Sequence, residues 1–284
     1  MIGGIGMDLN FFQSLIYGFL AGLSDILPVS AQAHKSILLK IFGQDSEPAV
    51  LRLIVHLAVF AALYYGCRSQ IQRIMRQQRL AKIPKRRRKR PVDMRSIMDL
   101  RLLQTTLVPI FIGFLIHFKT ASLESSLAWV AAFLVVNGVL LFLPALLPSG
   151  NKDSRSMTRV DGLLMGLGGA ASALPGISSI GAAVSVAMVR GADRVYAVNM
   201  ALLMHMAVTV GLILFDFIAL FTAGAGTISF GILVGYLVAA LSAFAGAWLG
   251  IRLVRSLTVH IGFDVFAYYC WGAALLAFIL YLSV

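Results

Sequence analysis

The sequence predicts an all-α polytopic membrane protein, built as an inverted-topology repeat whose two re-entrant helix pairs meet near the bilayer midplane. Three observations predict this fold. Hydrophobic residues make up 59% of the 284-residue chain and the mean hydropathy is +0.87, which is more apolar than soluble domains are. Six apolar segments are long enough to cross a bilayer. Two further apolar segments, one in each half of the chain, are interrupted by Pro and Ser.

The membrane-spanning helices follow from segment length, because a spanning helix needs roughly 20 apolar residues. The segments that satisfy this requirement are 48–66, 102–118, 127–148, 196–220, 228–250 and 262–283. Cys67 and Cys270 are the only cysteines, and each lies in or beside a span. Neither a disulfide framework nor a cysteine-based metal site is therefore expected.

The first interrupted segment is 10–42, which carries the motif L-P-V-S at 27–30. Proline breaks a helix interior because it lacks an N–H donor and clashes with the preceding turn. The motif therefore predicts one half-helix that ends at Pro28 and a second over 31–42. Ser30 is a natural N-cap for the second half-helix.

The second interrupted segment is 160–190, which carries L-P-G-I-S-S at 174–179. Its second half-helix is expected over 179–190, with Ser178 as the N-cap. Broken helices at membrane depth are tolerated only where they line a site enclosed by protein. The two breaks together predict a polar site between them.

The charge pattern predicts the orientation. The net charge is +12, and thirteen of the 24 Lys and Arg residues lie in 68–101, including K-R-R-R-K-R at 85–90. Lys and Arg concentrate in cytoplasmic loops, so 67–101 is expected in the cytoplasm, where it can contact anionic lipid. Nucleic-acid binding is disfavoured, because the run sits between two spans and no aromatic residues interleave with it. This orientation places the uncharged loop 222–226 outside.

With this orientation, 10–42 enters the membrane from the outer face and 160–190 from the cytoplasmic face, which is typical of an inverted repeat. The sequence L-I-V-H-L-A-V at 53–59 also resembles L-L-M-H-M-A-V at 202–208. Each follows its Pro at a similar distance: 28 residues to His56 and 30 to His205. The predicted organisation is one membrane domain, 1–284, with a first repeat core 10–66, a basic cytoplasmic loop 67–101, two spans in 102–148, a second repeat core 157–222 and two C-terminal spans in 228–283.

The predicted site favours an anion, phosphate above all, because half-helix N-termini present free N–H groups and positive dipole ends. Asp25 is an ionisable group at membrane depth, which is usually functional. His34 could act as a general acid, as a general base or as a hydrogen-bond donor to phosphate. We predict catalytic roles for Asp25, Ser30 and His34, with phosphate or lipid contacts from Ser30, Gln32, Lys35, His56, Ser178, Ser179 and His205.

Purely structural roles for these residues are also compatible with the sequence. The two serines could only cap their helices, and the Lys35 ammonium could snorkel toward the interface. His56 and His205 could be donors in helix packing, and Asp216 could pair locally within its span.

The motifs resemble those of the undecaprenyl-diphosphate phosphatase family, also called the bacitracin-resistance family, over about 12–283. The first family motif reads E-G-L-T-E-F-L-P-V-S-S-T-G-H, against A-G-L-S-D-I-L-P-V-S-A-Q-A-H at 21–34. The second reads P-G-x-S-R-S-G-A-T, against P-G-I-S-S-I-G-A-A at 175–183. The G-A-D-R at 191–194 resembles the family's following G-x-S-R.

The resemblance implies a helical bundle with two re-entrant pairs that hydrolyses undecaprenyl diphosphate to the monophosphate, at the outer side of a bacterial cytoplasmic membrane. It also implies a divalent cation, Mg or Ca, for which Asp25 is the candidate ligand, with Gln32 beside it. Several family groups are replaced here: the first Glu by Ala21, the second by Asp25, and the Arg by Ser179. Losing one such electrostatic element typically costs about a hundred- to a thousandfold in rate.

Three functions remain as hypotheses. The retained Pro, Gly and Ser framework favours a protein that binds and translocates a polyprenyl-phosphate carrier lipid, with weakened phosphatase chemistry. The retained Asp25, Ser30 and His34 favour a phosphatase that recycles the carrier lipid. The basic loop 68–101 favours a non-catalytic partner of envelope enzymes. The sequence leaves the oligomeric state open, a homo-oligomer included.

Overall fold

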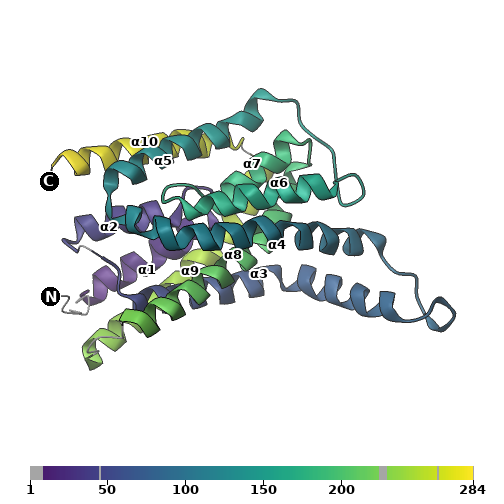
Figure 1. Cartoon of the computed structure of the whole chain (residues 1–284), viewed down its shortest axis with the longest axis horizontal. Helices are drawn as coiled ribbons and strands as arrows, with labels where there is room; N and C mark the ends of the chain where they lie inside the picture. The colour runs from purple at the N-terminus through teal and green to yellow at the C-terminus, as the bar shows by residue number, and fades with distance from the viewer. Residues whose placement is uncertain (1–8, 45, 224–228, 261, 284) are drawn as a thin grey trace.

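The computed structural model describes residues 9–44, 46–223, 229–260 and 262–283, and within these residues the protein is helical without a β-strand. Residues 224–226 of the predicted outer loop lie outside the described part. The α-helices are α1 Phe11–Ile26, α2 Ala31–Ile41, α3 Ala49–Lys82, α4 Met94–Thr120, α5 Leu127–Phe142, α6 Arg159–Ala170, α7 Ser179–Val189, α8 Arg194–Ala223, α9 Phe230–His260 and α10 Asp264–Leu282 (Figure 1). The all-α polytopic prediction is confirmed.

Six helices of the described residues are long and apolar enough to cross a membrane, and each contains the core of one predicted span. They are α3, α4, α5 with its 3₁₀ extension Leu143–Leu146, α8, α9 and α10. α10 packs along α5, and the indole N–H of Trp271 donates a hydrogen bond to the Val135 carbonyl at 3.2 Å (Figure 1). The membrane domain is thus a bundle of packed spans around two shorter helix pairs.

The basic segment 67–101, which is predicted to connect two spans in the cytoplasm, is mostly helical. α3 continues to Lys82 and α4 begins at Met94, so the two helices extend together beyond the rest of the bundle (Figure 1). Arg73 of α3 approaches Asp99 of α4 at 3.6 Å. Lys, Arg and Gln, which are abundant here, are good helix formers, so charge alone does not end a helix.

Both expected helix breaks are present. The first pair, α1 and α2, is interrupted at 27–30, where Ser30 has a φ of +69°. The second pair, α6 and α7, is interrupted at 171–178, where Gly176 has a φ of +118°. A side chain at Gly176 would also meet α5, since a Cβ there would lie 2.8 Å from the Val130 carbonyl oxygen. This break therefore needs glycine both for its backbone angle and for close packing.

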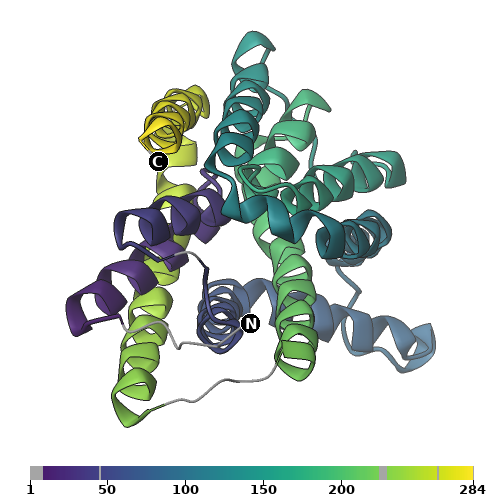
Figure 2. The same cartoon turned by 60° about the vertical axis from the view of Figure 1, so that its left-hand side comes forward.

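The first pair is held against α9 by small residues. A Cβ added at Gly18 or Gly22 would lie 2.0 Å from the carbonyl oxygen of Ala239 or Ala243, respectively. Small residues allow such close backbone approach between membrane helices. Figure 2 shows α1 lying against α9 along this contact.

The two breaks meet at Asn137 of α5. Its Nδ2 donates to the Pro28 carbonyl at 3.0 Å, and its Oδ1 accepts from the Ser178 amide at 2.9 Å. Asn137 is fully buried, and Gly181 packs directly on Pro28. One side chain therefore joins the first helix pair to the second and sets the position of the site. The inverted orientation of the two pairs relative to a membrane stays a prediction.

Candidate functional site

A small cavity of about 30 Å³ lies where the two breaks meet. Eight of the nine predicted site residues line it: Asp25, Ser30, Gln32, Lys35, His56, Ser178, Ser179 and His205. They come from five helices or the breaks before them, so the fold gathers groups that are distant in sequence. Gathering these residues does not test the individual roles, which stay predictions.

Both half-helix N-termini border this cavity. Ser30 caps α2 by accepting from the Ala33 amide at 3.4 Å, and Ser178 caps α7 by accepting from the Gly181 amide at 3.2 Å. Each cap satisfies one of the backbone amides that have no acceptor within the helix. In the part of the chain that the structure describes, the amides of the first two residues of each helix remain free to bind a ligand. The cavity thus has two positive helix ends on its wall, an arrangement that suits an anion.

Three polar side chains form a chain of hydrogen bonds along the cavity wall; two of them are buried, and the third, Asp25, is partly buried. Ser179 Oγ lies 2.5 Å from His205 Nδ1, and His205 Nε2 lies 2.9 Å from Asp25 Oδ2. His205 is 2% exposed and Ser179 is 5% exposed, so bulk water does not separate them. The sequence motifs did not predict this pairing, because α1, α7 and α8 contribute one residue each.

His56 belongs to a second buried cluster beside the cavity. Its Nδ1 lies 2.6 Å from Asp216 Oδ2, and the Arg52 guanidinium pairs with the other oxygen of Asp216. Arg52 also lies over the Phe215 ring, 5.3 Å from its centroid. Asp216 therefore pairs across helices α3 and α8 rather than only locally. This ion pair ties α3 to α8 and holds His56 against the cavity.

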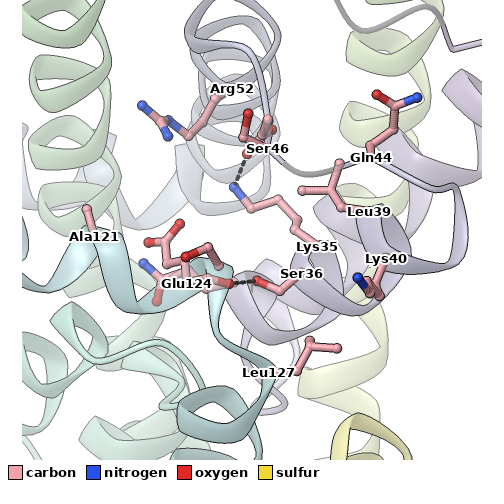
Figure 3. A pocket seen from close by; sticks show the side chains of 13 residues that line it. Lys35, Ser36, Leu39, Lys40, Gln44, Ser46, Arg52, Ala121, Glu124 and Leu127 are labelled. Atoms are coloured by element: carbon pink, nitrogen blue, oxygen red, sulfur yellow. Dashed lines mark hydrogen bonds and ion pairs between the residues drawn. The ribbon is translucent and has the colours of Figure 1, made fainter. Parts of the chain in front are cut away.

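Lys35 borders two spaces. One is the 30 Å³ cavity described above, here called the inner cavity, and the other is a larger pocket of about 180 Å³, here called the outer pocket, which is lined by Glu47, Arg52 and Glu124 among others. Its ammonium donates to Glu47 Oε2 at 2.9 Å, and both side chains are buried. Figure 3 shows Lys35, Arg52 and Glu124 around this hollow, while the Ser36 hydroxyl donates to the Glu124 carbonyl at 2.8 Å. Glu47 and Glu124 were missed by sequence reasoning, although an acidic residue directly before an apolar span was a usable signal.

His34 is the predicted site residue that does not line the cavity. Its Nδ1 lies 2.7 Å from the Ser30 carbonyl and its Nε2 lies 2.7 Å from the Tyr269 hydroxyl. A carbonyl can only accept, so Nδ1 carries the proton and Nε2 accepts from Tyr269. The two rings stack at 5.6 Å. His34 thus links α2 to α10.

The resemblance implies a divalent cation, which needs oxygen or nitrogen ligands from the side chains around the cavity and the outer pocket. Among the described residues, no group of three or more His, Cys, Asp or Glu side chains is placed to hold a metal ion. Two buried acceptor oxygens on the outer pocket, Gln32 Oε1 and Glu47 Oε1, have no donor within the described part of the chain. Mg²⁺ is often held by one or two protein oxygens plus substrate phosphates and water. These two residues therefore suit a cation that is shared with a bound phosphate.

Comparison with known proteins finds the same family over most of the chain. A family model described as bacitracin resistance protein BacA matches residues 14–276. An undecaprenyl-diphosphatase from Methanobrevibacter smithii is 27% identical over 279 residues, which is 95% of this chain and 97% of that protein. Undecaprenyl-diphosphatase 3 from Bacillus cereus is 26% identical over 274 residues, covering 96% and 98%, respectively. A third such protein, from Carboxydothermus hydrogenoformans, is 26% identical and covers 93% and 94%.

Proposed function

Because this chain belongs to the bacitracin-resistance family of undecaprenyl-diphosphatases, we propose that it binds a polyprenyl diphosphate and hydrolyses it to the monophosphate. The observation that supports hydrolysis best is the cavity itself, where two helix N-termini face a serine that contacts a histidine. Such a site offers charge stabilisation and proton transfer together. Hydrolysis therefore ranks above pure binding, although several family groups are replaced.

The head group would enter through the outer pocket, which is the wider of the two spaces. Lys35 borders both spaces and can follow an anion from one to the other. The inner cavity of about 30 Å³ is too small for a phosphate, so the Lys35–Glu47 pair must move when the terminal phosphate enters. The phosphate would then replace Glu47 as the partner of the ammonium, which keeps the buried charge paired.

A divalent cation bound with the diphosphate would be held by Gln32 and Glu47 and would offset phosphate charge. The expectation that Asp25 is the metal ligand also stays a proposal. In the structure Asp25 Oδ2 is engaged by His205. The protein's own contribution is to bind the head group and to orient it against α7.

We place the site at the outer face of a cytoplasmic membrane. Support comes from the charge pattern: the basic hairpin 67–101 lies at one end of α3 and the outer pocket at the other. The positive-inside rule then puts the outer pocket on the non-cytoplasmic side. A carrier lipid whose head group faces outward would reach it from the outer leaflet.

Translocation of the carrier lipid is a second candidate, favoured by a specific observation. A second pocket of about 330 Å³, lined by Gln70, Arg73 and Asp99 among others, lies near the far end of α3. Arg52, on the outer pocket, is 18 residues from Gln70, or about 27 Å along the helix at 1.5 Å per residue. Polar pockets on both sides of two meeting helix breaks suit alternating access.

The proposal is tested with the full-length protein in detergent. Phosphate release from undecaprenyl diphosphate is measured with added Mg²⁺ or Ca²⁺ and again with a chelator. We expect release that depends on the cation, and we expect Lys35→Gln to lower kcat/KM by about ten- to a hundredfold, because a charge-assisted contact is lost. Lys119→Gln removes an exposed lysine at the same end of the molecule and should not change the rate. Tight binding of undecaprenyl phosphate without any release would favour the translocation candidate instead.

A further inference from the structure

We propose that Ser179 is the nucleophile of this protein, with His205 as its general base and Asp25 as the group that orients His205. This inference rests on the proposed hydrolytic function and identifies the residues that carry it out. Ser179 stands where the family motif has Arg, so the assignment concerns this chain in particular.

The hydrogen-bond geometry supports one proton arrangement. A carboxylate can only accept, so the 2.9 Å contact with Asp25 places the His205 proton on Nε2. His205 Nδ1 is then an acceptor, and the Ser179 hydroxyl donates to it at 2.5 Å. A serine that donates to a histidine, which in turn donates to a carboxylate, is the arrangement that activates a hydroxyl for attack. Ser179 and His205 are buried, so water does not compete for the proton that passes between them.

The position of Ser179 on α7 supplies the charge stabilisation. Ser178 is the N-cap, so Ser179 is the first residue of the helix. The Gly181 amide is taken by Ser178 Oγ and the Ala182 amide by the Ser178 carbonyl. Within the described residues, the amides of Ser179 and Ile180 have no acceptor and lie at the helix end nearest the cavity. These donors can receive charge that develops on a phosphoryl oxygen.

Ser30 is the alternative nucleophile, and its surroundings argue against it. Its hydroxyl accepts from the Ala33 amide, and the nearby His34 is bonded through the Ser30 carbonyl and not through the hydroxyl. The other nitrogen of His34 is occupied by Tyr269. Ser30 therefore has a capping contact and no base, whereas Ser179 has a base directly beside it.

Besides the diphosphate, water is the only reactant that this hydrolysis needs. Ser179 Oγ forms a bond to the terminal phosphorus, and its proton passes to His205 Nδ1. The bond from that phosphorus to the bridging oxygen breaks, and the leaving polyprenyl phosphate takes its electron pair and then the proton. Water next attacks the phosphoserine, giving a proton to His205 Nδ1. The bond to Ser179 Oγ breaks, the serine recovers that proton, and inorganic phosphate leaves.

The test uses the full-length protein in detergent with Mg²⁺ and farnesyl diphosphate labelled in its terminal phosphate. Reactions are quenched in acid during turnover, and phosphoserine is located by mass spectrometry. We expect label on Ser179. Ser179→Ala should lose at least about a hundredfold in phosphate release while its affinity for undecaprenyl phosphate changes less than about threefold. Ser185→Ala is the matched control, because Ser185 is a buried serine on the same helix whose hydroxyl has no partner among the described residues.

Asp25→Asn tests the positioning role. It should lower kcat about tenfold or more with KM changed less than about threefold, because the head group contacts other residues. Label on Ser30, or phosphate release by Ser179→Ala at the wild-type rate, would overturn the assignment and leave hydrolysis standing. Wild-type protein that binds undecaprenyl phosphate and releases nothing from either diphosphate would overturn the hydrolytic function and the nucleophile with it.

Discussion

At the scale of single residues, Asn137 is the side chain on which the geometry of the site depends most. It is fully buried and makes one hydrogen bond to each helix break, through its two different amide atoms. Only Asn and Gln donate through a nitrogen and accept through an oxygen of one carboxamide, and Gln is one methylene longer. Its removal leaves the buried Ser178 amide without a partner and leaves the Pro28 carbonyl with only the long 3.8 Å contact from the Cys270 thiol.

Asn137→Ala should therefore lower the free energy of unfolding by about 2–4 kcal/mol, since the orphaned Ser178 amide costs about 1–3 kcal/mol and the loss of the stronger hydrogen bond to the Pro28 carbonyl adds about 1 kcal/mol. Thermal unfolding of the detergent-solubilised protein measures the loss. Gln104→Ala is the control, because Gln104 is an exposed amide on α4 and such changes stay within about 0.5 kcal/mol. Equal stability of both variants would contradict the bridging role.

Which residues the sequence could predict depends on whether their role is local. Ser30 and Ser178 follow from the breaks beside them, because capping involves neighbours three residues away. Ser179, His205 and Asp25 were each candidates, but their chain of hydrogen bonds joins positions up to 180 residues apart. The partner of His34 is also distant in sequence: its spacing from Ser30 places both near one face of α2, and its ring contacts Tyr269 of α10. Spacing along a helix indicates a face and does not identify what that face meets.

At the scale of helices, the contact between α1 and α9 decides where Asp25 lies. Gly22 precedes Asp25 by three residues and touches the Ala243 backbone directly. Any side chain at Gly22 must push α1 away from α9, and Asp25 moves with α1, which disturbs its 2.9 Å contact with His205. Packing of small residues and site geometry are thus coupled through one helix.

Gly22→Ala should destabilise the protein by about 1–3 kcal/mol, the usual cost of overpacking, and should also lower phosphate release. Gly272→Ala is the matched control, because Gly272 also lies in a helix and a Cβ there meets nothing within 4 Å. That change should be neutral or slightly stabilising, as Ala is the better helix former. Unfolding curves and phosphate release for the pair separate local crowding from a general effect of losing glycine. A Gly22→Ala protein as stable as the wild type would show that α1 is not pressed against α9.

The long helices were predictable because hydropathy acts over about 20 residues and does not depend on partners. The breaks were predictable because proline disrupts the helix locally, through its missing N–H group and its clash with the preceding turn. The charge pattern predicts a cytoplasmic connection at 67–101 and says nothing of its local structure, which is a helical hairpin. Its helices are extensions of α3 and α4, and their pairing through Arg73 and Asp99 is a tertiary feature.

At the scale of the whole molecule, the charge distribution and the positions of the pockets together define two different ends. The outer pocket lies near the start of α3 and the end of α4, whereas the hairpin tip carries Lys85 and its basic neighbours. α4 alone spans about 40 Å at 1.5 Å per residue, enough to separate these ends across a bilayer. The orientation then decides which leaflet presents the lipid head group.

The orientation is checked by labelling introduced cysteines with a membrane-impermeant maleimide in intact cells. Lys119→Cys, near the outer pocket, should react in intact cells, and Lys85→Cys should react only after the membrane is disrupted. Both lysines are exposed, whereas the native Cys67 and Cys270 are buried and should stay silent in the wild-type control. The reverse pattern would put the pocket in the cytoplasm. A carrier lipid presented in the inner leaflet would then be the substrate, and the thirteen basic residues of 68–101 would face outward, against the charge asymmetry on which the positive-inside rule rests.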